Sequence, residues 1–141
     1  MRIGFASDHA GFNLKEQLRT LAEKQGYDVV DFGTNGTASV DYPDFAHRAA
    51  AGKDSWDRLV LVCGSGIGIS IAANRHTCIR CALVTSVEHA RLARSHNNAN
   101  AIAIGQRISN FLDAKSFLEA FLKTEFEGGR HQQRIEKIDK W

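Results

Sequence analysis

Short runs of apolar and often β-branched residues alternate along the chain with longer segments whose apolar residues recur every three or four positions. The short runs are typical of strands and the longer segments of amphipathic helices. The continuous apolar run at 59–62 is typical of a strand buried on both faces, so it predicts the centre of a sheet. The predicted strands cover residues 3–6, 29–32, 59–62, 79–84 and 101–104.

The segments between these strands predict helices, and residues that commonly begin or end helices stand at their ends. Pro43, the only proline, can open a helix, and Gly26 and Gly52 can each end one. Alternating strands and helices predict an α/β fold, namely a single-domain Rossmann-like three-layer αβα sandwich with a five-stranded parallel sheet. The predicted helices run through Leu14 to Ala22, from Pro43 to Ala50, through Ile71 to Ala73, over 87–95 and 111–121, and from Gly128-Gly129 to the C-terminus.

Size and charge narrow the class of protein. A chain of 141 residues is close to the usual size of one domain, so we expect a single domain over 1–141. The formal net charge is +2, too balanced for the basic surface of a nucleic-acid-binding protein. No apolar stretch approaches the roughly 18 residues of a membrane helix, and residues 1–5 do not resemble a signal peptide. We therefore expect no nucleic-acid or membrane partner and a cytoplasmic location.

Three cysteines cannot all pair within one chain, and we expect them to be reduced. Cys78 and Cys81 have the Cys-x-x-Cys spacing of redox and zinc sites. In an extended strand, residues three apart project from opposite faces at roughly 10 Å, too far for a disulfide. The nearby histidines match no usual ligand spacing, so no metal site is predicted. Core packing is the preferred interpretation of both residues.

The segment Cys63-Gly64-Ser65-Gly66-Ile67-Gly68-Ile69-Ser70 puts a thiol and three glycines between the central strand and a helix. Exposed backbone amides and the helix dipole at such a turn favour a bound anion. A nucleotide-binding P-loop lacks its Lys-Ser/Thr pair here, and Ile69 stands where a dinucleotide motif needs glycine. Two interpretations remain: an anion cradle beside a thiol, or a tight turn with a buried cysteine.

Other polar residues follow predicted strands or helices. Asp8 and His9 come after the first strand, and parallel central strands would bring them beside the cradle; a helix cap and a loop histidine are the plainer interpretation. His96 and Asn97 precede the last strand, where a histidine can act as acid or base toward sugar oxygens and asparagine commonly ends a helix.

Three arginines are candidate anion ligands. Arg130 and Arg134 are four residues apart and share one face of a helix, where two guanidinium groups can clamp a phosphate. Arg107 lies just past the last predicted strand. A solvated charged helix is the alternative for the C-terminal pair, because more charged residues follow it.

Together these motifs resemble the family of type B ribose-5-phosphate isomerases, which also contains galactose-6-phosphate isomerase subunits. The resemblance implies a cofactor-independent and metal-free aldose–ketose isomerase of sugar phosphates. It also implies a homodimer or dimer of dimers with shared active sites, in which the helix within 128–141 lies at the dimer and active-site region. The matching motifs, in order, are Ser7-Asp8-His9-Ala10-Gly11, Asp41-Tyr42-Pro43, residues 63–74, His96-Asn97, Gly105-Gln106-Arg107 and residues 127–134.

The same resemblance implies a role for each matching residue. Cys63 would move a proton between C2 and C1 through an enediolate, and Ser65 would exchange protons with O1 and O2. Another branch of the family has a glutamate where this chain has Ile69, which cannot act as a base, so the proton transfer falls to Cys63 here. The binding roles fall to amides of Gly64, Gly66, Ile67 and Gly68 for the enediolate, Asp8 and His9 for hydroxyls, His96 and Asn97 for ring opening, and Arg107, Arg130 and Arg134 for phosphate.

The expected reaction interconverts ribose 5-phosphate and ribulose 5-phosphate. A hexose-6-phosphate isomerase, acting on galactose or allose phosphates, is the closest alternative. From a different class, a non-catalytic sugar-phosphate-binding module would keep the anion cradle but would not need the thiol of Cys63.

Overall fold

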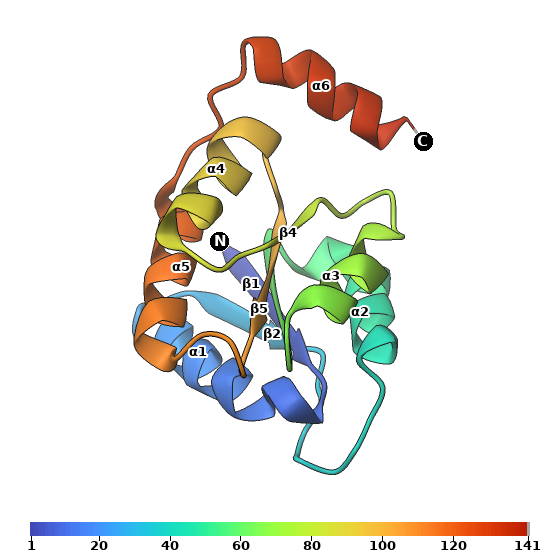
Figure 1. Ribbon diagram of the computed structural model, residues 1–141, viewed down its shortest axis with the longest axis vertical. Coiled ribbons are helices and arrows are strands. Elements are labelled where there is room, and N and C mark those ends of the chain that lie inside the picture. The colour runs from blue at the N-terminus through green and yellow to red at the C-terminus, as the bar shows by residue number, and fades with distance from the viewer. Residues whose placement is uncertain (141) are drawn as a thin grey trace.

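The computed structural model describes residues 1–140, and Trp141, the last residue of the predicted C-terminal helix, lies outside them (Figure 1). Five strands form one parallel sheet in the order β2-β1-β3-β5-β4. The predicted parallel sheet is confirmed, and β3 lies at its centre because its apolar run is buried on both faces. The strands are β1 (Arg2–Ser7), β2 (Asp28–Asp31), β3 (Arg58–Cys63), β4 (Cys81–Leu83) and β5 (Ala101–Gly105).

Helices cover both faces of the sheet, which confirms the three layers. Val60 and Val62 point toward α1, α4 and α5, where Leu18 and Phe117 join the same core cluster. Leu59, Leu61 and Cys63 point the other way, toward α2 and α3. The helices are α1 (Phe12–Lys24), α2 (Tyr42–Ala51), α3 (Ile67–Asn74), α4 (Val87–Asn97), α5 (Phe111–Lys123) and α6 (Arg130–Asp139), with 3-10 turns η1 (His9–Gly11) and η2 (Lys53–Ser55).

Local sequence explains where several helices begin and end. Pro43 stands in the first turn of α2, where its missing N–H is not needed. The Ser86 hydroxyl caps α4 by accepting from the amide of His89. Asn98 ends α4 in the left-handed conformation with φ 44°, so the helix runs to Asn97, two residues beyond the predicted end. His96 and Asn97 therefore form the last turn of α4 rather than following it.

The last helix, α6, lies across the end of the molecule and stands apart from the three layers (Figure 1). It is fixed at both ends: His131 and Ile135 are buried, and Asp139 forms an ion pair with Arg80 at 2.5 Å. No helix among residues 1–140 is long and apolar enough to cross a membrane.

The prediction for the strand at 79–84 is only partly right. The strand β4 covers only Cys81–Leu83, because before it the amide of Arg80 donates to the side chain of Asn100 at 2.9 Å and the amide of Ile79 donates to the carbonyl of His76 at 3.0 Å. The side-chain amide of Asn74 binds the N–H and the C=O of Cys81, each at 2.8 Å. Cys78 precedes the strand and is exposed, so the prediction that it packs in the core is wrong. Cys81 does pack against the α2–α3 core, and burial raises the pKa of its thiol. All three cysteines are free thiols.

Candidate active site

The direction of the chain's connections reverses between the two central strands. From β1 the chain continues to β2 on one side, and from β3 it continues to β4 and β5 on the other. In parallel sheets, ligands bind at such a point, outside the carboxyl ends of the strands. Here a pocket of about 350 Å³ opens at that edge, lined by Asp8, His9, Tyr42, Cys63, Ser65 and Arg107 among others.

Gly66 shapes the turn after β3. Its φ of 78° lies in the left-handed region that favours glycine, and it is the N-cap of α3. A Cβ there would lie 2.8 Å from Cδ1 of Leu83 and 2.9 Å from the backbone carbon of Ile104. The amides of Gly68 and Ile69 in the first turn of α3 have no helix partner, and Gly66 has no side chain to cap them. The turn therefore has the geometry of the predicted anion cradle.

Cys63 lies at the inner end of this pocket and is only 4% exposed. Its Sγ accepts a hydrogen bond of 3.1 Å from the amide of Gly66. This donor orients the sulfur and puts the positive end of an amide dipole beside it. Next to it, Ser65 Oγ accepts from the amide of Ile67 at 3.2 Å. The turn therefore holds both a thiol and a hydroxyl at the pocket.

Arg107 reaches the same pocket from β5. Its amide donates to the carbonyl of Gly64 at 3.0 Å, and the amide of Gln106 donates to the carbonyl of Cys63 at 2.9 Å. A Cβ on Gly64 would lie 3.1 Å from Nη1 of Arg107, so a side chain at this position would crowd the guanidinium. The positive charge of the Arg107 guanidinium therefore lies over the turn, beside the residue that follows Cys63.

Asp8 and His9 also line the pocket, as expected from their position after β1. Asp8 is buried, and its Oδ1 accepts from the amide of Gly11 at 3.0 Å, so it is both a cap and a pocket residue. Nδ1 of His9 lies 3.1 Å from both the amide nitrogen and the carbonyl oxygen of Val40. The backbone of Val40 therefore holds the imidazole through Nδ1, and Nε2 has no part in this contact.

Tyr42 is a pocket residue that sequence reasoning missed. Its ring covers Gly68, where a Cβ would lie 2.5 Å from Cζ of Tyr42. Its place directly before Pro43 indicates a helix start, and the motif Asp41-Tyr42-Pro43 matches the family, but neither signal assigned Tyr42 a role in the site. The contact with Gly68 joins residues 26 positions apart, and local pattern does not reveal such contacts.

Four predicted site residues lie elsewhere. His96 and Asn97 end α4, Arg130 and Arg134 belong to α6, and none of them lines the pocket at Cys63. The segment after Asn97 lies at the amino end of β3, because the amide of Leu59 donates to the carbonyl of Asn100. The length of β3, about 13 Å between Leu59 and Cys63, separates the two groups. Figure 1 shows α6 near the amino ends of the strands, opposite their carboxyl ends.

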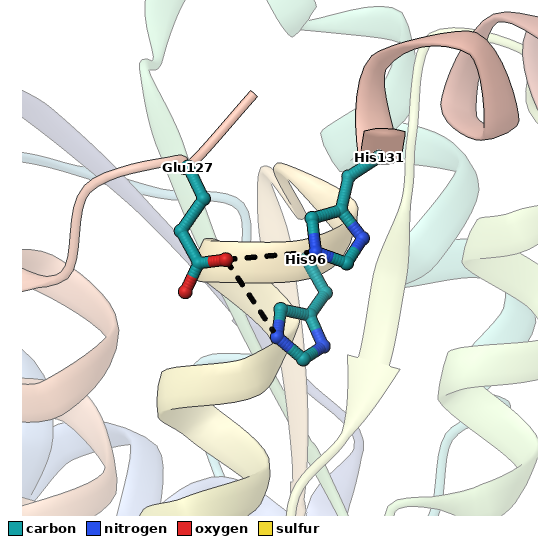
Figure 2. Close-up of side chains that lie close together, drawn as sticks. All are labelled: His96, Glu127 and His131. Atoms are coloured by element: carbon teal, nitrogen blue, oxygen red, sulfur yellow. Dashed lines mark ion pairs between the residues drawn. The ribbon is translucent and has the colours of Figure 1, made fainter. Parts of the chain in front are cut away.

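At this opposite edge, His96, Glu127 and His131 form a cluster (Figure 2). The two imidazole rings are stacked, with centroids 4.3 Å apart and planes 14° apart. A metal ion must lie near the plane of each imidazole that binds it, and two rings stacked in this way cannot both direct a nitrogen at one ion. The stacked cluster therefore does not fit a shared metal ion.

Buried Arg94 secures the end of α4 that carries this cluster. Its Nη1 donates to the side chain of Asn98 at 2.8 Å and to the carbonyl of Ala99 at 2.6 Å, and its Nε donates to the carbonyl of Thr124 at 3.4 Å. Burial lowers the pKa of Arg94 to about 10, so the group stays charged at neutral pH. The end of α4 and the segment before α6 are thus held together.

A doubly wound α/β sheet whose central strand ends in a thiol and an amide-lined turn defines an α/β protein with a site for a small anionic ligand. The chain belongs to the Ribose/Galactose Isomerase family, whose family model matches residues 3–138. It is 41% identical over 140 residues to Ribose-5-phosphate isomerase B of Escherichia coli, an alignment that covers 97% of this chain and 93% of that protein.

Solved structures agree with this membership. Ribose-5-Phosphate Isomerase B of Clostridium thermocellum superposes with a TM-score of 0.97 at 46% identity, covering 99% of this chain and 96% of that one. Ribose-5-phosphate Isomerase B of Mycoplasma genitalium, solved with bound ribulose-5-phosphate, gives a TM-score of 0.93 at 40% identity, with coverage of 99% and 94%.

Proposed function

We propose that this chain is an aldose–ketose isomerase that interconverts ribose 5-phosphate and ribulose 5-phosphate, using Cys63 as the base and neither metal nor cofactor. The observation that carries this proposal is the thiol of Cys63 in a pocket bounded by the amides that open α3. A binding module would need the amides but not the thiol. Membership of an isomerase family supports the same conclusion.

The proposed chemistry begins with the open-chain aldose. The Cys63 thiolate removes the proton from C2, an enediolate forms, and the same sulfur returns the proton to C1. Ser65 exchanges protons with O1 and O2. The amides of the turn stabilise the developing negative charge, and each such donor contributes on the order of 3 to 4 kcal/mol to transition-state binding.

One chain does not bring all the proposed residues together, because the two groups lie at opposite edges of the sheet. We therefore propose a homodimer in which a second copy brings its His96, Asn97, Arg130 and Arg134 to the pocket at Cys63. An exposed apolar surface beside the pocket supports such an interface. It consists of Ile67, Ile71, Leu83 and Val87, which are 52%, 61%, 37% and 47% exposed.

A cavity of about 740 Å³ supports the same arrangement from the other side. It lies between the end of α3, β4 and α6, and Asn97 and Ile138 line it. In the dimer this cavity would receive the apolar surface of the other copy. Asn97, which lines the cavity, and its neighbour in sequence His96 would then face that copy's thiol.

Within the assembled site, the phosphate would bind to arginines. Arg107 comes from the chain that provides Cys63, and Arg130 and Arg134 come from the second copy. Arg130 and Arg134 are exposed in the single chain and lie one helical turn apart on α6. At this spacing two guanidinium groups can clamp one phosphate. Asp8 and His9 would bind sugar hydroxyls. A thiol base works only while reduced, which fits a cytoplasmic location.

An assay of the purified protein on a panel of pentose and hexose phosphates tests this function. We expect ribose 5-phosphate and ribulose 5-phosphate to interconvert with the highest kcat/KM, and Cys63→Ala to lose this activity. A higher kcat/KM on a hexose 6-phosphate would replace the proposed substrate. Sugar-phosphate binding without isomerisation of any substrate would establish the binding module instead.

A further inference from the structure

One face of the His96 imidazole is covered by His131. The ring centroids lie 4.3 Å apart with planes 14° apart (Figure 2). The His131 side chain is 8% exposed and that of His96 is 37% exposed, so His96 is the ring that a ligand can reach. A stacked neighbour of this kind fixes the plane of the imidazole while leaving its outer edge free.

A carboxylate lies beside both rings. Oε2 of Glu127 is 3.5 Å from Nε2 of His131 and 4.0 Å from Nε2 of His96 (Figure 2). The amide of Glu127 donates to the carbonyl of Ser95 at 3.0 Å, so the backbone that carries this carboxylate is joined to the end of α4. The position of Glu127 relative to His96 is therefore set by backbone contacts.

The surroundings of His131 disfavour its charged form. Burial lowers the pKa of His131, and the nearby charges of His96, Arg130 and Arg134 lower it further, against an opposing effect of Glu127. His131 is therefore neutral at neutral pH and places no positive charge beside His96. The other charged groups that act on this cluster are Arg91 and Glu88, both on α4.

We propose that Glu127 and His131 are positioning residues for His96: His131 fixes the plane of the ring, and Glu127 stabilises its protonated form for opening the sugar ring. The inference rests on the proposed function. In that step the His96 imidazolium gives a proton to the ring oxygen O4 as the C1–O4 bond breaks. The C1 hydroxyl proton then returns to the imidazole as the C1 aldehyde forms, which leaves His96 unchanged.

A substrate that cannot close a furanose ring separates this role from isomerisation. We would measure kcat/KM for the wild type, Glu127→Gln and His131→Asn on ribose 5-phosphate and on 4-deoxyribose 5-phosphate, which lacks the hydroxyl that closes the ring. Glu136→Gln is the matched control, because this exposed carboxylate also lies in the C-terminal region and accepts a hydrogen bond from the side chain of Gln132 at 2.9 Å.

We expect each cluster variant to lose about tenfold in kcat/KM on ribose 5-phosphate, a fraction of what a complete acid–base group contributes. On the 4-deoxy substrate the kcat/KM of each variant should stay within about twofold of the wild-type value. In Glu127→Gln the alkaline limb of the ribose 5-phosphate pH profile should also move to lower pH, because the imidazolium loses its carboxylate. Activity on the 4-deoxy substrate also shows that each variant is folded.

Equal losses on both substrates, or no loss on either, would overturn the positioning role while leaving the isomerase proposal intact. An unmoved alkaline limb in Glu127→Gln would remove the electrostatic part of the role. If the wild type isomerises neither substrate, the proposed function itself fails, and the positioning role fails with it.

Discussion

The amide of Gly66 donates a hydrogen bond of 3.1 Å to Sγ of Cys63. The left-handed backbone of Gly66, with φ 78°, then directs the chain from this turn into α3. The residue that starts the helix thus also orients the thiol. This relationship couples the stability of the turn to the proposed chemistry.

Gly66→Ala is expected to destabilise the protein and to lower its activity. The left-handed backbone alone costs an alanine about 1 kcal/mol. The new methyl would also lie 2.9 Å from the backbone carbon of Ile104, which cannot move aside as a side chain can, and overpacking of this kind costs about 1 to 3 kcal/mol more.

Gly128→Ala is the matched control, because Gly128 has φ 69° and nothing within 4 Å of its Cβ position. Chemical denaturation should show the larger loss of unfolding free energy for Gly66→Ala. Equal losses for the two variants would mean that the packing at Gly66 is not a constraint.

Arg107→Ala is expected to weaken binding of sugar phosphates specifically. The guanidinium stands over Gly64 in the pocket, and a charge-assisted contact with phosphate contributes about 1.5 to 3 kcal/mol. We expect KM for ribose 5-phosphate to rise by about tenfold or more, with a much smaller change in binding of unphosphorylated ribose. Calorimetric titration with both sugars checks this, and equal losses for both would place Arg107 outside the phosphate site.

Heterodimers of two inactive variants should regain activity. A dimer of Cys63→Ala with Arg134→Ala contains one site with both lesions and one intact site, if each site takes its thiol and its arginine from different chains. Heterodimers purified through two different tags should therefore have about half the wild-type activity. Heterodimers as inactive as either parent would show that Cys63 and Arg134 do not work across an interface.

The stability of the protein should depend on the titration of His131. Its pKa is lowered in the folded protein from the ordinary 6.5, so below about that pH the unfolded chain binds more protons and stability falls. His131→Phe keeps a stacked ring without a titrating group. Its Tm should fall less than that of the wild type between about pH 7.5 and pH 5.5. The same fall in both proteins would contradict this account of His131.

Much of the fold was predictable from local pattern. The apolar run in β3 predicted a strand buried on both faces, and the polar residues after β1 and β3 were expected to meet because parallel central strands end at one edge. Asp8, Cys63 and Arg107 accordingly line one pocket.

The remaining features depend on contacts between distant segments. The side chain of Asn100 binds the amide of Arg80 just before β4, and Tyr42 lines the pocket where it packs on Gly68. Neither contact has a local signature. The separation of His96 from Cys63 follows from chain direction. His96 precedes β5 and Cys63 ends β3, and because the strands are parallel these two positions lie at opposite ends of the strands.

The central claim is that Cys63 carries the proton between C2 and C1, and isomerisation in deuterated water tests it most directly. NMR spectra of the sugar phosphates should show deuterium at C1 of ribulose 5-phosphate and at C2 of ribose 5-phosphate with the wild type. The same exchange should occur with Cys78→Ala, whose thiol is exposed and away from the pocket. With Cys63→Ala we expect no exchange while the sugar phosphate still binds. Exchange at the wild-type rate by Cys63→Ala would contradict the account.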